Sequence, residues 1–567
     1  MISVSGIKWS ETKVNKNLLE KIRQDLKFSE ILSRLIISRN FDQQELHEIQ
    51  NTSKIINPFK DNKDFIQASN ILENSIRNKD KICIFGDYDV DGIASTSLFA
   101  KFFNHIKHPY FFYIPNREKD GYGPSISLFK KLYLKKPKLV IMVDCGSSSN
   151  EAVDFLRSKK IKSIIIDHHE INKPYPKSDS LINPKKNSTF LLKNYFCATT
   201  LTYFFLEILI KRLRSSFKIS DFLIYALLAL ICDVMPLRKI NRSIALNVLK
   251  NFNVNNNLVF KTLYELSGKK NKFKIEDLGF FVGPIINSCG RLLKSNIAAE
   301  LLISYSASIV KSKSQELIKL NNNRKKLENI ILNEIDFNKI KKKNKDVIIY
   351  YDSKIHEGLI GIIASRLKEF FNKPSIVITE SKNILKASAR STSDYNIGYL
   401  INKLINNKLI EKGGGHNLAA GFLIKKNKIN DLEKFILNDF QLINKNYLNK
   451  SFYDSEISPS AINRNFINEI NRLAPFGNAN QLPIFLIKNL KIIKTTILKE
   501  RHISLILKPK LGRYINSICF NSVNTPVGEF LMSYKKEVSV IAQIHENIWN
   551  NKKTLQLNIK DVLINSN

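Results

Sequence analysis

Acidic and imidazole side chains gather at a few points between residues 86 and 233. The run Gly86-Asp-Tyr-Asp-Val-Asp-Gly puts three carboxylates within five residues, and three further groups occur downstream. The complete set is Asp87, Asp89, Asp91, Asp144, Asp167, His168, His169 and Asp233. Like charges this close repel one another unless a cation or a basic ligand compensates them. The pattern therefore predicts a cation site.

Carboxylates and imidazoles without thiolates are ligands for a hard or borderline divalent ion such as Mn²⁺ or Mg²⁺. Two such ions about 3.5–4 Å apart activate water and stabilise the leaving oxygen in phosphoester hydrolysis. For any single strand-end aspartate, a helix N-cap is an equally good interpretation, and a single histidine is more often a core residue. The convergence of several such groups in one domain favours metal chemistry.

The elements that must position these groups form an alternating pattern. Short β-branched runs at 81–86, 110–115, 139–144 and 163–167 alternate with helical segments such as 93–103 and 151–160. This pattern predicts a parallel sheet buried on both faces. Ligands of such sheets collect at the carboxyl ends of the strands, which is where the acidic groups lie.

The rest of the chain indicates an α/β protein of several domains. After Asp233 the pattern is helical, and 298–337 is amphipathic with few breakers. Strands are expected at 347–351 and 375–379. Five β runs after 484 favour a small barrel or sandwich. The predicted divisions are a helical extension (1–60), a parallel-sheet domain with a helical part (61–297), a long connecting helix and linker (298–345), a second α/β domain (346–445) and a β-rich domain (450–567).

The composition supports a polyanionic partner but does not require one. The chain has 567 residues, with 89 Lys and Arg against 51 Asp and Glu, a formal net charge of +38. Enrichment in Lys, Asn and Ile also arises from AT-biased coding, so both explanations stay open. Six scattered cysteines without a Cys-x-x-Cys pair suit a reducing, cytoplasmic location. We expect no signal peptide, and the apolar stretch 222–237 is too short to span a membrane.

At the acidic groups the sequence resembles a known family. Gly86-Asp-Tyr-Asp-Val-Asp-Gly, Val143-Asp-Cys-Gly and Asp167-His-His are similar to the first three motifs of the DHH phosphoesterase superfamily. Within it, the chain resembles the bacterial single-strand-specific 5′→3′ DNA exonucleases. Supporting stretches include Cys232-Asp-Val-Met-Pro-Leu, Gly283-Pro-Ile-Ile-Asn-Ser-Cys-Gly-Arg, Ala387-Ser-Ala-Arg-Ser and Gly413-Gly-Gly-His-Asn-Leu-Ala-Ala-Gly.

The resemblance implies roles for the acidic groups. The ligands of two divalent ions would be Asp89, Asp91, Asp144, His168 and Asp233, with Asp144 as the bridge. Asp87 would be a ligand directly or through water. His169 would face the scissile phosphate as a hydrogen-bond donor or an acid/base group, and Asp167 would orient an imidazole.

For the second half of the chain, the resemblance implies a DHH-associated domain and an OB-fold domain. A nucleotide and its phosphates would be held by Ser388, Arg390 and a loop of Gly414, Gly415 and His416. Arg117 would contact the 5′-phosphate of the DNA, and Arg291 is a further candidate contact. Trp549, Tyr514 and Phe520 could stack on bases, although core packing is the better expectation for each. Cys145, Ile285 and Leu293-Lys294 depart from the family pattern.

The implied function is a metal-dependent 5′→3′ exonuclease that releases 5′-mononucleotides from single-stranded DNA in DNA repair and recombination. The implied cofactor is Mn²⁺ or Mg²⁺, and the implied partners are single-stranded DNA, a single-strand-binding protein and a RecQ-type helicase, with a monomeric chain and no membrane. Two alternatives stay open: a DHH phosphodiesterase acting on oligoribonucleotides or cyclic dinucleotides, and a non-catalytic single-strand-binding relative.

Overall fold

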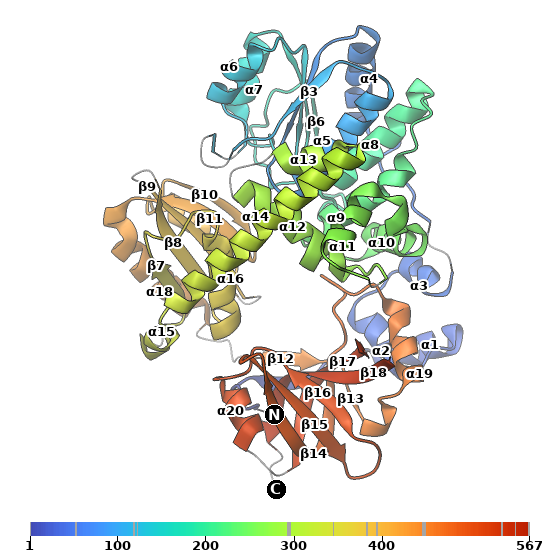
Figure 1. The fold of residues 1–567 in the computed structure, drawn as a ribbon, viewed down its shortest axis with the longest axis vertical. Helices are drawn as coiled ribbons and strands as arrows, with labels where there is room; N and C mark the ends of the chain where they lie inside the picture. Colours follow the sequence, from blue (N-terminus) through green and yellow to red (C-terminus); the bar gives the residue numbers. More distant parts are fainter. Residues whose placement is uncertain are drawn as a thin grey trace. The chain divides into compact units, whose positions relative to one another are not determined.

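The chain divides into two compact units in the computed structural model (Figure 1). Unit 2 comprises Thr52–Phe337 with Ser353–Ile363, and unit 1 comprises Met1–Asn51, Asn338–Asp352 and Ala364–Asn567. The structure describes residues 2–51, 54–116, 120–121, 123–270, 272–291, 296–343, 345–381, 384–392, 395–444, 450–533, 537–549 and 552–564.

Unit 2 is built on a five-stranded parallel sheet in the order β3-β2-β4-β5-β6, as the alternating pattern predicts. Its strands are β2 (Ile82–Gly86), β3 (Tyr110–Tyr113), β4 (Leu139–Val143), β5 (Lys162–Ile166) and β6 (Ser180–Ile182). Its helices are α4 (Lys63–Arg77), α5 (Val90–His105), α6 (Ile126–Tyr133), α7 (Asn150–Ser158), α8 (Ala198–Leu213), α9 (Leu223–Cys232), α10 (Lys239–Asn251), α11 (Leu258–Leu266), α12 (Gly283–Arg291), α13 (Asn296–Ile303) and α14 (Ala307–Glu334).

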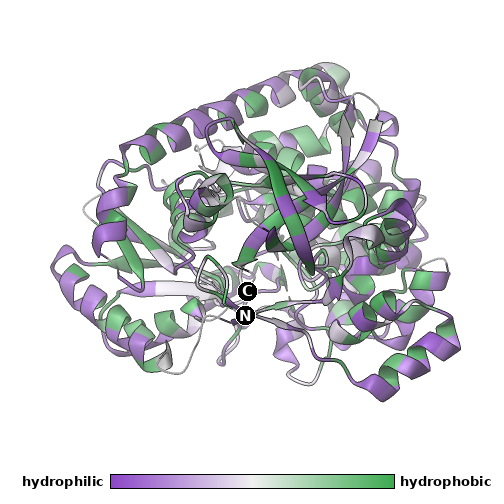
Figure 2. Cartoon of the chain, turned by 90° about the horizontal axis from the view of Figure 1, so that it is seen from below, coloured by the Kyte–Doolittle hydropathy of each residue, from purple (hydrophilic) through white to green (hydrophobic). Residues whose placement is uncertain are grey.

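Both faces of this sheet are buried, since helices pack on each of them. Successive residues of a strand point to opposite faces. Ile82 and Ile84 pack into a core with residues of α4, α5 and α8. Cys83 and Phe85 pack with residues of α6 and α7 on the other face. Helices α4, α6 and α7 bury one face and expose the other, whereas α5 and α8 are buried along most of their length. Figure 2 shows apolar and polar residues alternating along many helices of the chain. The short strand β6 was not expected from the sequence pattern.

The amphipathic segment 298–337 is interrupted, contrary to the expectation of one connecting helix. Helix α13 ends at Ile303, and α14 starts at Ala307 after a break that contains Ser304 and Ser306. The hydroxyl of Ser304 accepts the backbone N–H of Ser306 at 3.1 Å, an alternative to helical hydrogen bonding. The longer of the two helices therefore begins about ten residues later than expected.

Unit 1 contains a five-stranded mixed sheet in the order β10-β11-β9-β8-β7. Its strands are β7 (Ile348–Tyr351), β8 (Ser375–Ser381), β9 (Ile384–Arg390), β10 (Lys412–His416) and β11 (Ala419–Ile424), accompanied by α15 (Phe337–Lys343), α16 (Ile360–Phe371), α17 (Ile397–Asn406) and α18 (Ile429–Asn444). Helix α17 packs Leu400, Ile401 and Leu404 into the core beneath the sheet. The glycine run expected to form a loop is instead the edge strand β10.

The C-terminal part of unit 1 is a closed barrel. Strands β14 (Phe485–Leu498), β15 (His502–Pro509), β16 (Ile515–Cys519), β18 (Lys552–Ile564) and β17 (Glu537–Trp549) pair in that order, and β17 pairs back to β14. Strands β16 and β18 are parallel, and α20 (Pro526–Ser533) joins β16 to β17. This connectivity is the five-stranded OB fold that the resemblance implies.

Two aromatic residues of the barrel contradict the expectation of core packing. Tyr514 is 61% exposed and Phe520 is 52% exposed. Lys508 lies over the ring of Tyr514 at 5.5 Å, and His502 meets the ring of Phe520 edge to face. The side chain of Trp549 lies outside the described residues.

The N-terminal residues complete the barrel region. They form β1 (Lys8–Glu11), α1 (Lys16–Leu26), α2 (Glu30–Ser38) and α3 (Gln43–Gln50), whereas only helices were expected here. Strand β1 pairs in parallel with β12 (Lys450–Tyr453), which precedes β13 (Ser455–Ile457) and α19 (Arg464–Ile470). Leu32 and Leu35 of α2 join the barrel core. Among the described residues, no helix is long and apolar enough to cross a membrane.

Candidate metal centre

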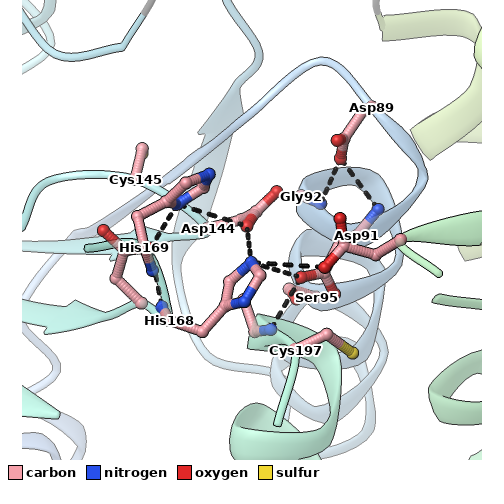
Figure 3. Close-up of polar contacts among 12 residues, drawn as sticks. Asp89, Asp91, Gly92, Ser95, Asp144, Cys145, His168, His169 and Cys197 are labelled. Carbon is pink, nitrogen blue, oxygen red and sulfur yellow. Dashed lines mark hydrogen bonds and ion pairs between the residues drawn. The ribbon is translucent and has the colours of Figure 1, made fainter. Parts of the chain in front are cut away.

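The carboxyl ends of neighbouring strands in unit 2 bring the predicted acidic and imidazole groups together (Figure 3). Asp87–Asp91 follow β2, Asp144 follows β4, Asp167–His169 follow β5, and Asp233 ends α9. They form three overlapping groups, and within each group the possible ligand atoms lie within 4.8 Å of one another. These groups are Asp87-Asp89-Asp144, Asp91-His168-Asp233 and Asp144-His168-His169.

His168 lies where these groups overlap. Its Nε2 is 3.2 Å from Oδ1 of Asp144 and 3.6 Å from Oδ2 of both Asp91 and Asp233. Burial and the neighbouring His169 lower the pKa of His168 to about 4. The ring is therefore neutral at physiological pH, which is the state in which imidazole binds a metal ion.

Asp144 carries the strongest indication that the cluster needs a cation. Its backbone is left-handed, with φ 61°, and its side chain is buried. In the part of the chain that the structure describes, its Oδ1 accepts no hydrogen bond. Burial, together with the charges of Asp91 and Asp89, raises the pKa of Asp144 well above its usual value. A divalent ion would satisfy this oxygen and remove the repulsion, so the donor set fits Mn²⁺ or Mg²⁺.

Asp89 and Asp91 combine helix capping with membership of the cluster. Oδ1 of Asp89 accepts the backbone N–H groups of Asp91 and Gly92 at 2.9 and 3.2 Å, which caps α5. Asp91 accepts the N–H groups of Ala198 and Thr199 at 2.6 and 2.7 Å, at the start of α8. Both aspartates thus accept backbone N–H groups at the start of a helix and also belong to the cluster of possible metal ligands.

Burial also shifts the pKa values of the other carboxylates of the cluster. It raises the pKa of Asp89, and the charge of Asp91 raises it further. It raises the pKa of Asp233 well above the usual value, and Asp91 and Asp89 again contribute. Because Asp91 and Asp89 raise the pKa of the carboxyl groups beside them, the cluster favours a bound cation that compensates the gathered negative charge.

Several supporting residues were not found by sequence reasoning. The Thr199 hydroxyl donates to Asp91 Oδ1 at 2.6 Å, and the backbone N–H of Val90 donates to Asn287 Oδ1 at 3.2 Å. A Cβ on Gly290 would come within 2.5 Å of the Tyr88 carbonyl oxygen, so α12 packs directly on the acidic loop. Asn287 and Gly290 lie in the Gly283–Arg291 stretch, and that stretch was the available signal.

Asp167 and His169 form a pair beside the cluster. Nδ1 of His169 donates to Oδ1 of Asp167 at 2.7 Å, and the backbone N–H of Ser147 donates to Oδ2 at 3.0 Å. Burial opposes protonation of His169, but Asp167 raises its pKa to about 9. Asp167 remains ionised, because His169 and these hydrogen bonds hold its pKa well below the usual range despite burial. The His169 side chain is 34% exposed, so a substrate can reach it.

Three family models match the chain: the N-terminal domain of the DHH family over residues 81–231, the DHHA1 domain over 344–441 and the RecJ OB domain over 453–561. The RecJ exonuclease of Bacillus subtilis is 26% identical over 99% of this chain and 71% of that protein. The RecJ exonuclease of Haemophilus influenzae is 28% identical over 83% of this chain and 87% of that protein. The chain thus combines a DHH-family domain, a DHHA1 domain and a RecJ OB domain, and it is similar to RecJ exonucleases over most of its length.

The solved structures agree with the fold. A crystal structure of RecJ from Thermus thermophilus in complex with Mn²⁺ superposes with a TM-score of 0.82 at 20% identity, over 99% of this chain and 80% of that chain. A second crystal structure from the same organism contains Mg²⁺ and gives a TM-score of 0.75. The three-part architecture of sheet domain, second α/β domain and OB barrel is therefore that of the RecJ family.

The residues that the RecJ resemblance assigns to nucleotide binding lie on one face of the mixed sheet of unit 1. Across three strands, Ser388 pairs with Gly421, and Gly421 pairs with Gly414. A Cβ on Gly414 would meet no atom within 4 Å, so the row is open at its β10 end, whereas Ser388 at the other end is buried. Arg390 lies two residues along β9 on the same face, and its guanidinium donates to the Ser388 hydroxyl at 3.4 Å.

Neighbouring positions of the RecJ glycine run differ in their surroundings. A Cβ on Gly415 would come within 2.4 Å of the Ala419 carbonyl oxygen, so Gly415 allows β10 to pair closely with β11. Arg117 and the side chains of Arg291 and His416 lie outside the described residues. The structure thus brings the metal-site candidates together in unit 2, and Ser388, Arg390 and Gly414 together in unit 1.

Proposed function

We propose that this chain is a metal-dependent exonuclease that degrades single-stranded DNA from the 5′ end and releases 5′-mononucleotides in DNA repair and recombination. The observation that carries the proposal is the buried cluster around Asp144, where carboxylates and a neutral imidazole converge. Relatives of 25–28% identity are named as single-stranded-DNA-specific exonucleases and extend over most of the chain, which supports the substrate class.

The ligands of the proposal are the residues at the strand ends. Asp89, Asp91, Asp144, His168 and Asp233 would hold the metal, with Asp87 beside them, and Mn²⁺ or Mg²⁺ would supply Lewis-acid chemistry for phosphodiester hydrolysis. Asp144 is the candidate bridge between two ions, because it belongs to two of the three groups. The bound cations also permit an anionic substrate to approach this acidic site.

His169 is the group we assign to the scissile phosphate. With a pKa of about 9 it is an imidazolium at physiological pH, and Asp167 occupies its Nδ1 hydrogen. An imidazolium in this position would donate to a phosphate oxygen or to the leaving oxygen. Asn183 fixes the same segment, since its amide donates to the Ser147 hydroxyl at 2.9 Å and to the His169 carbonyl at 3.0 Å.

Unit 1 would hold the strand. The row Ser388-Gly421-Gly414 lets a nucleotide approach the backbone closely, and Arg390 beside it offers a planar fork to phosphate. The OB barrel carries exposed Tyr514 and Phe520 with basic neighbours, a combination suited to base stacking along a single strand. A barrel of this kind supports a polymeric substrate over a cyclic dinucleotide.

The deciding experiment uses single-stranded DNA labelled separately at each end, incubated with Mn²⁺ or Mg²⁺. We expect a 5′ label to appear at once as mononucleotide, while a 3′ label stays on progressively shorter strands. The variant Asp144→Ala should lose this release. Release that begins with the 3′ label would refute the polarity.

The same assay separates the alternatives. Faster hydrolysis of a dinucleotide than of the long strand would indicate the oligoribonucleotide or cyclic-dinucleotide phosphodiesterase. Retained DNA binding with no metal-dependent release would indicate the non-catalytic relative. A cytoplasmic location is part of the proposal and is supported by six free cysteines. The single-strand-binding protein, the helicase and the monomeric state stay predictions.

A further inference from the structure

An exposed aromatic ring lies on a turn of unit 2 that packs against the end of α9, the helix that Asp233 follows. Phe280 is 84% exposed, and Val234, the residue after Asp233, is 65% exposed. Most phenylalanines of this unit are buried in its core, including Phe99, Phe102, Phe204 and Phe205. Large apolar side chains exposed close to a functional site mark a surface that contacts a ligand.

The backbone around Phe280 explains the position of its ring. Residues Leu278–Val282 form a π-helical turn, η4, that leads into α12. A Cβ on Gly279 would come within 3.2 Å of Ile231 Cγ2, and one on Gly283 within 2.3 Å of Cys232 Sγ. Both contacts are made with the end of α9, directly before Asp233. The turn is therefore packed against the segment that supplies a candidate metal ligand.

The two adjacent phenylalanines of this turn have different surroundings. The Phe281 ring meets the Tyr264 ring edge to face at 5.4 Å, and Lys269 lies over it at 4.9 Å. Packing of Phe281 against this pair anchors the turn and leaves Phe280 on the solvent side. The local π-helix, a form that is frequent at functional sites, accommodates this arrangement.

Backbone strain accompanies the exposed residues. Val234 adopts φ 54°, a left-handed conformation that is unfavourable for a β-branched side chain. Such strain persists only where the surrounding structure enforces it, and it concentrates at ligand sites. Val234 directly follows Asp233, so an exposed apolar side chain stands next to the candidate ligand in the sequence.

We propose that Phe280 is a stacking platform for one base of the single-stranded DNA whose phosphodiester lies at the metal centre. The inference rests on the proposed function and adds a base contact beside the phosphate contacts. Every base offers a π face, so the contact would be independent of sequence. A base within a duplex is already stacked and paired, so the same ring would favour an unpaired strand.

The test compares the full-length protein with Phe280→Ala, Phe280→Trp and, as a matched control, Leu191→Ala. Leu191 is 87% exposed in the same unit and has no place in the site. Each variant is assayed on single-stranded DNA, and on strands with an abasic analogue at each of the first few positions. For Phe280→Ala we expect KM to rise about 5- to 150-fold with little change in kcat, the range that one lost base–aromatic stack gives.

Phe280→Trp and Leu191→Ala should retain the wild-type KM. At one position, the abasic analogue should raise KM for the wild type and cause no further rise for Phe280→Ala. This non-additivity would identify the stacked base, because a structural defect would add to the effect of the missing base.

Three results would overturn the inference. The first is an unchanged KM in Phe280→Ala while wild-type hydrolysis proceeds, which leaves the proposed function intact. The second is a drop in melting temperature or a change in oligomeric state for Phe280→Ala, which would show that the ring packs on another part of the chain or on a second copy. If the wild type hydrolyses nothing, the proposed function fails, and the role of the ring is tested by binding of oligothymidylate instead. An unchanged affinity of Phe280→Ala and an unquenched fluorescence of Phe280→Trp would then refute the stacking role of Phe280.

Discussion

Replacing Thr199 by valine should weaken metal binding without disturbing the fold. The Thr199 hydroxyl lies 2.6 Å from Asp91 Oδ1, 2.9 Å from the Asp91 carbonyl oxygen and 3.0 Å from the Ser95 hydroxyl. It has one hydrogen to donate, and the shortest contact is to the carboxylate. Valine keeps the volume of threonine and removes its hydroxyl, so the donor to Asp91 and the contact with Ser95 are lost together. Asp91 retains the N–H groups of Ala198 and Thr199, so the start of α8 stays capped.

The size of the effect follows from the charge of the acceptor. A hydrogen bond to a charged group contributes about 1.5–3 kcal/mol, and the loss of a partner that orients a metal ligand typically lowers metal affinity about 10- to 100-fold. Thr200→Val is the matched control. The hydroxyl of this equally buried neighbour donates to the Cys197 carbonyl at 2.7 Å and does not contact Asp91.

The assay is a Mn²⁺ titration of nucleotide release from single-stranded DNA, combined with thermal melting in EDTA and in Mn²⁺. Thr199→Val should need about 10- to 100-fold more Mn²⁺ for half-maximal rate, whereas Thr200→Val should match the wild type. Equal Mn²⁺ requirements for the two variants would show that Asp91 only caps α8 and does not contribute to the metal site.

Three further predictions concern other parts of the chain. Asp144→Asn should melt at a higher temperature than the wild type in EDTA, because one of the mutually repelling buried carboxylates is gone. The variant should gain no stability from Mn²⁺. Equal melting temperatures of the variant and the wild type in EDTA would contradict this. Gly414→Ala should melt like the wild type but show a higher KM, whereas Gly415→Ala should melt at a lower temperature because its Cβ meets the Ala419 carbonyl at 2.4 Å. A lower melting temperature for Gly414→Ala than for Gly415→Ala would contradict the faces assigned to the two glycines. Burial lowers the pKa of Lys101 to about 8 from its usual 10.5. Between these pH values the unfolded chain binds a proton that the folded chain has lost, so the free energy of unfolding rises with pH. Urea unfolding should show this rise, up to about 3 kcal/mol, in the wild type relative to Lys101→Met, and parallel pH profiles would exclude it.

The sequence predicted the elements whose signal is local. Strand β4 is a continuous apolar run, Leu-Val-Ile-Met-Val. Such a run is typical of a strand in a sheet that is covered on both faces. Because the carboxyl ends of parallel strands lie at one edge of a sheet, the strand pattern placed Asp144 at the same edge as Asp89 and His168, whereas the order β2-β4-β5 that makes them neighbours came from the structure. The candidate metal site was predictable for this reason.

The elements that depend on distant partners were not predictable in the same way. Strand β10 is Lys-Gly-Gly-Gly-His, which has little intrinsic preference for extended structure, and it forms because β11 pairs with all five of its residues. Thr199 and Asn287 reach the acidic loop across 108 and 197 residues. Nothing near Thr199 in the sequence indicates its contact, and Asn287 is marked only by the resemblance of the Gly283–Arg291 stretch to the family pattern. The break between α13 and α14 depends on a serine contact that a helical periodicity does not reveal.

The contact between the first strand and the barrel has a consequence for how the chain folds. Trp9 donates to Asp561 across 552 residues, and Val4 pairs with Val562. During synthesis the amino-terminal segment therefore leaves the ribosome long before its partner strand exists, with Leu32, Leu35 and Ile36 of α2 unburied in the meantime. Contacts this distant in sequence form late and slowly. Unit 2 can assemble from its own residues as they emerge, whereas the barrel region has to wait for translation to reach its final strand.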